Sequence, residues 1–178
     1  MDWNAFPASN DRRLLSKAFV EWVPEHGVNR KTLALASEAV FGDAIRWREI
    51  FPSGATEALW FVSDVSDASM QASFLITPAG CMAEVIDTRL DQNRSMKRFV
   101  KRVMQYDLLH PFQALARMQR TARVMYACVS PHKRASFPGL VSLNLFYTAL
   151  VFLWLIDGSP NDKRTKTATA RAMRMLGI

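Results

Sequence analysis

The side chains that most often carry out chemistry are few and widely spaced in this sequence. His26, His110 and His132 lie far apart, and none shares an HExxH or ExxH spacing that would place two metal ligands on one helix face. Cys81 and Cys128 are 47 positions apart with no further cysteine near either. This usage predicts neither a disulfide framework nor a metal site, and it suits a reducing compartment.

Motifs for nucleophilic catalysis and phosphate binding are also missing from the sequence. There is no GxSxG elbow, no GxxxxGK[ST] loop and no strand-linked GxGxxG. We therefore expect no catalytic residues, no metal and no cofactor. A helical enzyme stays a third alternative, and it would need histidines or carboxylates that converge in a cavity.

The charge of the chain is distributed unevenly along its 178 residues. Residues 1–91 hold 8 Lys/Arg and 13 Asp/Glu, whereas residues 92–178 hold 15 Lys/Arg and 3 Asp, which gives net charges of −5 and +12. A basic half predicts an anionic partner, either a nucleic acid or a membrane surface, although a solvated basic face is an equal alternative. The first residues, MDWNAFPASND, lack the apolar core of a signal peptide. We expect a cytoplasmic protein.

Apolar residues recur at helical spacing along nearly the whole chain, and no stretch alternates convincingly as a strand would. Pro24 and Gly27 are expected to end the first helix, and Pro111 the helix that begins near Arg94. The fold class predicted is all-α in one continuous domain, with helices over about 14–23, 32–39, 44–50, 59–65, 94–110, 112–129, 140–156 and 161–176.

The segment Leu140–Ile156 is the longest apolar run, and it is short for a membrane span. It contains Ser142, Asn144 and Thr148, so a buried helix is the better interpretation. Because this helix is apolar nearly all round, protein, lipid or a second subunit must cover every side of it. We expect a homodimer partner or a hydrocarbon ligand to provide part of that cover.

The first 52 residues have the helix lengths of a helix-turn-helix module, with residues 44–50 as the recognition helix. DNA binding would use the cations of this module, namely Arg30, Lys31, Arg46 and Arg48. Residues 11–60, however, contain seven basic and seven acidic side chains. Since DNA affinity comes mostly from neutralised phosphates, nucleic acid is an unlikely partner.

Several segments resemble known families. His26-Gly27, Leu35-Ala36 and Phe51 look like the N-terminal module of TetR-type regulators, which usually place a phosphate-contacting lysine where this chain has Gly54. Residues 51–59 (FPSGATEAL) are similar to the FPxGxxEL signature of the ubiquinone-biosynthesis accessory proteins numbered nine in the coenzyme Q series, which have a TetR-like fold. The resemblance continues, in order, through 110–111 (HP), 120–123 (RTAR), Tyr126, 146–148 (FYT), 155–160 (LIDGSP) and Thr165.

This resemblance implies a TetR-like fold, in which residues 1–52 form the helix-turn-helix-like module and residues 53–178 a helical ligand and dimerisation region. It also implies a non-enzymatic homodimer that binds an isoprenoid quinone or other lipid and presents it to the demethoxyubiquinone hydroxylase. On the same resemblance we expect a bound isoprenoid or phospholipid, and peripheral attachment to the inner membrane. The bulky and adaptable side chains expected to line the lipid site are Phe99, Met118, Met125, Leu143, Phe146, Tyr147, Leu150 and Trp154. A plain core and dimer interface is an equal alternative for each of these residues.

The last helix combines a small apolar side with a basic side that could meet an anionic membrane or the partner. Its cations are Lys163, Arg164, Arg171 and Arg174. Packing against the domain with a solvated basic face is the alternative for this helix. For the whole chain, the leading hypothesis is the lipid-binding accessory protein, and the alternative is a TetR-type DNA-binding transcriptional regulator.

Overall fold

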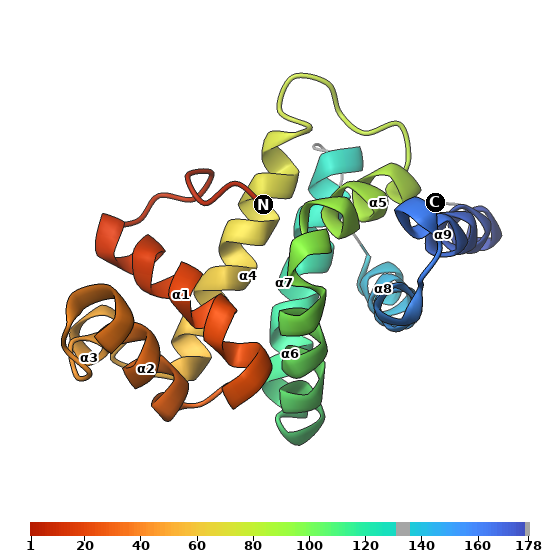
Figure 1. Ribbon diagram of the computed structural model, residues 1–178. Coiled ribbons are helices and arrows are strands. Elements are labelled where there is room, and N and C mark those ends of the chain that lie inside the picture. The colour runs from red at the N-terminus through yellow and green to blue at the C-terminus, as the bar shows by residue number, and fades with distance from the viewer. Residues whose placement is uncertain (131–135, 177–178) are drawn as a thin grey trace.

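The structure is a computed structural model that describes residues 1–130 and 136–176 (Figure 1). His132 lies outside the described residues. Within those ranges the chain forms α-helices and short 3-10 turns and no strand. The elements are α1 (Asn10–His26), α2 (Arg30–Phe41), α3 (Trp47–Ile50), α4 (Ala55–Ala72), α5 (Met82–Gln92), η1 (Arg94–Met96), α6 (Lys97–Leu109), α7 (Pro111–Val129), α8 (Phe137–Ile156), η2 (Pro160–Asp162) and α9 (Lys163–Leu176).

Helix α1 continues past Pro24 and ends just before Gly27, so the prediction is wrong for the proline and confirmed for the glycine. Proline removes only its own N–H, whereas the N–H of Gly27 still reaches the carbonyl of Val23 at 2.8 Å and closes the last turn. The helix ends at His26 because Gly27 has a φ of +76°, a backbone conformation that glycine tolerates and other residues rarely adopt.

Helix α3 has four residues, Trp47–Ile50, instead of the seven predicted over 44–50. The preceding residues form a turn, because the carboxylate of Asp43 accepts from the N–H of Ile45 at 2.9 Å. Ser37 on α2 ties this turn down: its hydroxyl donates to the carbonyl of Asp43 and accepts from the N–H of Trp47. The predicted recognition helix is therefore mostly a turn.

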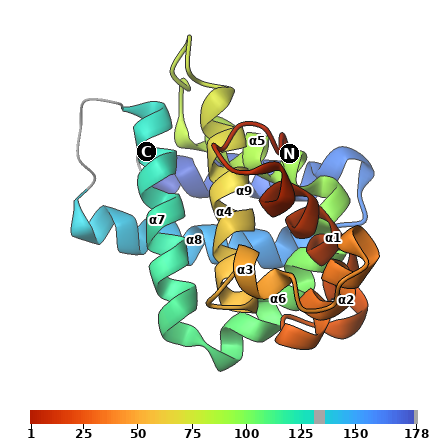
Figure 2. The same ribbon diagram turned by 90° about the vertical axis from the view of Figure 1, so that its left-hand side faces the viewer.

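Two buried apolar clusters hold the helices together. The first cluster joins α1, α2 and α3 to the first half of α4 and to α6, around Phe19, Phe51 and Phe99. The second joins the end of α4 to α5, α7, α8 and α9, around Met125 and Trp154. Figure 2 shows α4 running through the middle of the molecule, between the N-terminal helices and the C-terminal ones.

The helix α5 was not among the helices predicted from the sequence. Its apolar residues Met82, Val85, Ile86 and Leu90 do have helical spacing, and all four are buried in the second cluster. Pro78 and Gly80 lie just before it and interrupt the pattern, which hid a short helix beginning immediately after them.

A network of hydrogen bonds fixes the corner between α8 and α9. Asp157 accepts from the backbone and hydroxyl of both Ser159 and Thr165, at 2.6–2.9 Å. The hydrogen bonds from Ser159, and then those from Thr165, hold the pKa of Asp157 well below its ordinary value. Nearby, Asp162 accepts from Arg94, Lys97 and the indole N–H of Trp154, at 2.7–3.2 Å.

Helix α8 is buried on one side only, which corrects the prediction of a buried helix over 140–156. A mean hydropathy of 2.0 over 18 residues makes it long and apolar enough to cross a membrane, yet only 33% of that window is buried. Leu143 and Trp154 lie in the second cluster, whereas Leu145 and Ile156 are 68% and 81% exposed. The helices packed around α8 within residues 1–130 and 136–176 therefore leave one face of it uncovered.

Candidate functional site: a cavity among the central helices

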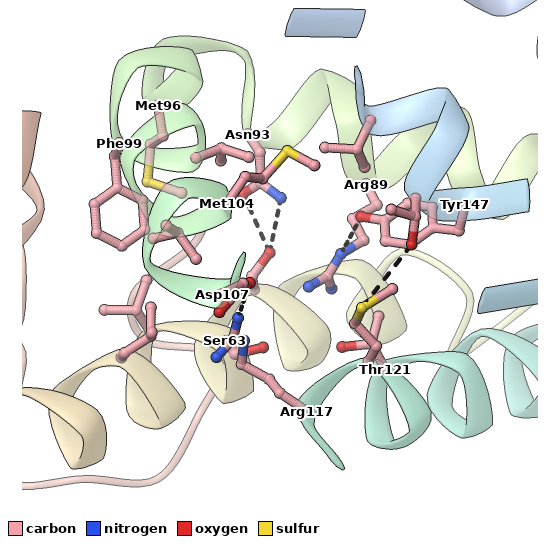
Figure 3. A pocket seen from close by; sticks show the side chains of 18 residues that line it. Ser63, Arg89, Asn93, Met96, Phe99, Met104, Asp107, Arg117, Thr121 and Tyr147 are labelled. Atoms are coloured by element: carbon pink, nitrogen blue, oxygen red, sulfur yellow. Dashed lines mark hydrogen bonds and ion pairs between the residues drawn. The ribbon is translucent and has the colours of Figure 1, made fainter. Parts of the chain in front are cut away.

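A cavity of about 150 Å³ lies where α4, α6, α7 and α8 approach one another beside the end of α5 (Figure 3). Its wall combines a large apolar area with a few polar side chains. The lining residues are Leu59, Val62, Ser63, Ser66, Arg89, Asn93, Met96, Phe99, Val100, Val103, Met104, Asp107, Arg117, Met118, Thr121, Tyr147, Thr148 and Val151.

The apolar wall of the cavity comes mainly from η1 and α6. Met96, Phe99, Val100, Val103 and Met104 recur at intervals of three and four residues, so they share one face of the helix, and all line the cavity. The cations of the same segment lie on the other side of α6, as the sequence pattern predicts. One helix thus separates an apolar interior from a basic exterior.

Arg89 forms the centre of a buried polar cluster at one end of the cavity. It is 6% exposed, and it makes an ion pair with Asp67 and donates from Nε to the hydroxyl of Tyr147 at 3.0 Å. Thr121 donates to the same carboxylate at 3.0 Å. Burial alone would lower the pKa of Arg89, but the Asp67 carboxylate and Tyr147 outweigh it and raise that pKa, so the guanidinium stays charged.

Two hydrogen-bond donors of this cluster have no acceptor in the part of the chain that the structure describes. Burial raises the pKa of Tyr147, with Arg89 opposing, so the phenol keeps its proton. Its oxygen accepts from Arg89, which leaves its O–H free to donate. Among the described residues, Nη2 of Arg89 also has no hydrogen-bonded acceptor, whereas Nε and Nη1 do. Both side chains line the cavity, so together they suit a ligand's acceptor oxygen.

A second polar pair, Asp107 and Arg117, lines the cavity near the junction of α6 and α7. Arg117 is 7% exposed and donates from Nη2 to one carboxylate oxygen of Asp107. The other carboxylate oxygen is buried without a partner among the described residues. Between the two pairs, Ser66 and Asn93 hydrogen-bond each other at 2.9 Å.

The residues predicted for lipid binding separate into three groups. Phe99, Met118 and Tyr147 line the cavity. Phe146 lies on a surface groove between α8 and α9. The remaining four belong to the second core cluster and do not line the cavity, namely Met125, Leu143, Leu150 and Trp154. Lipid binding by any of them stays a prediction.

The cations of the N-terminal module are partly engaged within the protein. Arg46 pairs with Asp11 at 2.7 Å and lies over the ring of Phe41, and Arg48 lies over the ring of Trp47. The exposed cations Arg30 and Lys31 begin α2. The side chain of Arg30 lies beside Gly54, where a Cβ atom would come within 3.4 Å of its Nε.

The basic residues of α9 lie on the surface, while the apolar side of this helix packs inward. Lys163, Arg164, Arg171 and Arg174 are all exposed, and the first three line the groove beside Phe146. Met173 is buried, and Ala168 and Ala172 are half-buried against the second cluster. The helix therefore offers charge to a partner but little apolar surface.

No cluster of three His, Cys, Asp or Glu side chains able to hold a metal occurs in the described part of the chain. His26 lies against Trp22, and His110 stacks on Tyr106 with ring centroids 3.9 Å apart. Neither histidine lines the cavity, and each of Asp67 and Asp107 is paired with an arginine. This arrangement suits binding better than acid–base chemistry.

Sequence reasoning missed Arg89 and Asp67, the charged pair at the polar end of the cavity. One signal was present, because Arg89 is the only Lys or Arg between Arg48 and Arg94 and is surrounded by apolar residues at helical spacing. A lone cation in such a pattern must be buried with a counter-charge or lie at a helix edge. The sequence alone does not say which acid pairs with it.

The fold matches that of a solved protein along nearly the whole chain. A crystal structure of the TetR transcriptional regulator from Nitrosomonas europaea ATCC 19718 superposes with a TM-score of 0.71 at 20% sequence identity, covering 95% of this chain and 99% of that one. No family model matches the sequence, and no curated protein matches it. The predicted all-α, TetR-like fold is thereby confirmed.

Proposed function

We propose that this chain is a non-enzymatic, lipid-binding accessory protein of ubiquinone biosynthesis that holds the ring of a prenylated quinone in the cavity beneath α6. The observation that carries this proposal is an apolar wall ending in the two free donors of Arg89 and Tyr147. A quinone ring has the matching chemistry, because its faces are apolar and its carbonyl oxygens accept hydrogen bonds.

The size of the cavity limits which part of the lipid it holds. An apolar cavity of roughly 150 Å³ takes a ligand about the size of benzene, and this cavity has that volume. The ring of a prenylated quinone fits, whereas its long tail must leave the cavity. The uncovered face of α8 offers apolar surface for the tail, since Tyr147, Thr148 and Val151 of the same helix line the cavity.

The same face of α8 supports a homodimer. Val141, Leu145, Phe152 and Ile156 are 38%, 68%, 50% and 81% exposed and form a stripe along the helix. Stripes of this kind pack against an identical helix in symmetric dimers. In this proposal the protein works at the cytoplasmic side of the inner membrane and presents the ring to the demethoxyubiquinone hydroxylase.

The test is to purify the protein, extract its ligands and identify them by mass spectrometry. We expect prenylated quinones or their precursors in the wild type. Met118→Trp fills the cavity and should remove most of the bound lipid, whereas the control Met175→Trp, on the exposed part of α9, should retain it. Recovery of no prenylated compound, together with no affinity for added benzoquinones, would refute the proposal.

A DNA-binding regulator is the second candidate function, favoured by the fold shared with a TetR regulator. Against it, α3 has only four residues, its Trp47 is buried and Arg46 is paired with Asp11. A fluorescence-anisotropy titration on promoter DNA over a series of salt concentrations decides the matter. Specific binding at physiological salt, lost in Arg30→Gln/Lys31→Gln, would favour the regulator.

A further inference from the structure

The corner between α6 and α7 exposes a group of large apolar side chains. Leu108, Leu109, Phe112 and Leu115 are 75%, 79%, 87% and 50% exposed. Single exposed leucines are ordinary, but four bulky side chains within eight residues form a contiguous patch that calls for a partner. Figure 1 and Figure 2 show this corner projecting at the opposite end of the molecule from the loop between α4 and α5.

The corner is held in this shape, so the apolar residues cannot turn inward. Pro111 starts α7 with the fixed φ that suits a first helical residue. His110 hydrogen-bonds the carbonyl of Tyr106 at 2.9 Å and stacks on its ring, and the hydroxyl of Tyr106 lies 3.0 Å from that of Thr56 on α4. The patch is therefore a fixed feature of the surface.

Basic residues lie behind the patch on both helices: at 1.5 Å per residue, Lys101 is about 10 Å from Leu108 along α6, and Arg123 is about 17 Å from Phe112 along α7. Residues 97–123 contain seven Lys/Arg and a single acid, Asp107, which is paired with Arg117. Arg98 and Arg120 pair with Glu25 and Asp64 of neighbouring helices, whereas the exposed Lys101 and Arg123 make no ion pair among the described residues. Apolar side chains between cations are the composition that binds the interface of an anionic bilayer.

A bilayer fits the corner better than a protein partner does because the apolar residues lie at a projecting turn between two helices. A protein interface needs roughly 800 Å² of matching surface on each partner, which a narrow corner between two helices does not offer. The headgroup region of a bilayer deforms around a wedge that enters about 5–10 Å. We therefore propose that the α6–α7 corner is a membrane-contact tip that inserts Leu108, Leu109 and Phe112 into an anionic bilayer.

Two other surfaces each have only one part of this combination. The α4–α5 loop exposes Leu75 and Ile76, but residues 71–83 contain no charged side chain. Helix α9 exposes four cations, but its apolar side packs inward. The corner differs from both in presenting four large exposed apolar side chains close together in sequence, with exposed cations on the same two helices.

The position of the tip has a consequence for the cavity, and this step rests on the proposed function. Met104 and Asp107 precede the tip on α6, and Arg117 and Met118 follow it on α7. At 1.5 Å per residue, the four residues from Met104 to Leu108 span about 6 Å. Insertion of the tip thus brings this end of the cavity to the headgroup region, where a lipid ring could enter.

The experiment measures co-sedimentation of the full chain with vesicles of phosphatidylcholine alone and of phosphatidylcholine mixed with phosphatidylglycerol. We expect stronger binding to the mixed vesicles, and a loss of about tenfold or more in Leu108→Ser/Phe112→Ser. The matched control Leu75→Ser/Ile76→Ser removes two exposed apolar residues at the other end and should bind as the wild type does. Equal loss in both variants, or loss only in Lys163→Gln/Arg164→Gln/Arg171→Gln, would overturn the proposal.

A polarity-sensitive fluorophore on Leu109→Cys, in a Cys81→Ser background, reports the depth directly. We expect a blue shift on mixed vesicles and none for the same fluorophore on Ile76→Cys. A shift that follows protein concentration without vesicles would instead make the corner an interface between copies of the chain. Vesicle binding with no lipid in the cavity would refute the proposed function but support the membrane-contact tip. Lipid in the cavity without vesicle binding would support the proposed function but refute the tip.

Discussion

Two buried polar clusters, one at the α8–α9 corner and one at the cavity, differ in how many of their donors and acceptors lack a hydrogen-bond partner. At the α8–α9 corner, every carboxylate oxygen of Asp157 and Asp162 accepts at least one hydrogen bond from Ser159, Thr165, Arg94, Lys97 or Trp154. At the cavity, Asp67 is equally satisfied, but Arg89 and Tyr147 keep donors beside open space. The first cluster fixes the path of the chain, whereas the second keeps donors that the proposed ligand would use.

The largest effect expected is on folding stability when each cluster loses its acid. Asp67→Ala leaves the buried Arg89 without a counter-charge and should lower the free energy of unfolding by about 3–5 kcal/mol. Asp162→Ala should cost less, about 1–3 kcal/mol, because Arg94 and Lys97 are partly exposed and reach water. Urea denaturation of both variants compares them, and a costlier Asp162→Ala would contradict the assignment of Arg89 as the more buried cation.

Tyr147→Phe should separate binding from stability. Loss of the hydroxyl removes one hydrogen bond and should cost about 1 kcal/mol of stability. It should also weaken binding of a benzoquinone ring about tenfold, while affinity for a ring-matched hydrocarbon stays the same. Calorimetric titration measures both, with Tyr126→Phe, outside the cavity, as the control. An equal loss for quinone and hydrocarbon would mean that Tyr147 only shapes the cavity.

Acid should loosen the α8–α9 corner through Asp157. Because hydrogen bonds from Ser159 and Thr165 lower the pKa of this carboxyl in the folded protein below its ordinary value of 3.8, its contribution is present above that value and is lost as the pH falls further. Asp157→Asn should therefore flatten the pH dependence of the melting temperature below about pH 4. A wild-type slope that survives in Asp157→Asn would assign the acid sensitivity to other groups.

The smallest effect concerns the two cysteines and leaves stability unchanged. Burial, with the Asp67 carboxylate adding to it, raises the pKa of the Cys128 thiol to about 11, whereas Cys81 is exposed. Since the thiolate is the reactive form, a thiol reagent at pH 8 should modify Cys81 quickly and Cys128 only when the helices separate. Fast modification of both in the native protein would contradict the packing around Cys128; Cys81→Ser isolates the slow reaction.

Much of the helical architecture could be predicted because the apolar spacing of most long helices, though not of α8, matches the face that they bury. The pattern of α6, with Phe99 and Val103 on one side and cations on the other, is an example. The shortening of α3 could not be predicted in the same way. It depends on Ser37, ten residues before Trp47, holding the intervening turn by hydrogen bonds that no periodicity records.

The polar end of the cavity could not be predicted from the sequence for a related reason. Arg89, Asp67 and Tyr147 lie on three helices, and only the packing of α4, α5 and α8 brings them together. By contrast, the resembling segment from Asp157 to Thr165 was found from its residue pattern. Its short spacing reflects local hydrogen bonds, which is the kind of structure that a contiguous motif can encode.

Two sides of helix α8 face different surroundings, and in the proposed function this couples ligand binding in the cavity to the association of two copies. Tyr147, Thr148 and Val151 border the cavity, while Leu145 and Phe152 are exposed on another side of the helix, where we propose that a second copy packs. A small rotation of α8 would alter the cavity wall and the exposed face of the helix together. If a ligand in the cavity changes the affinity between subunits by some factor, then subunit association changes the affinity for that ligand by the same factor.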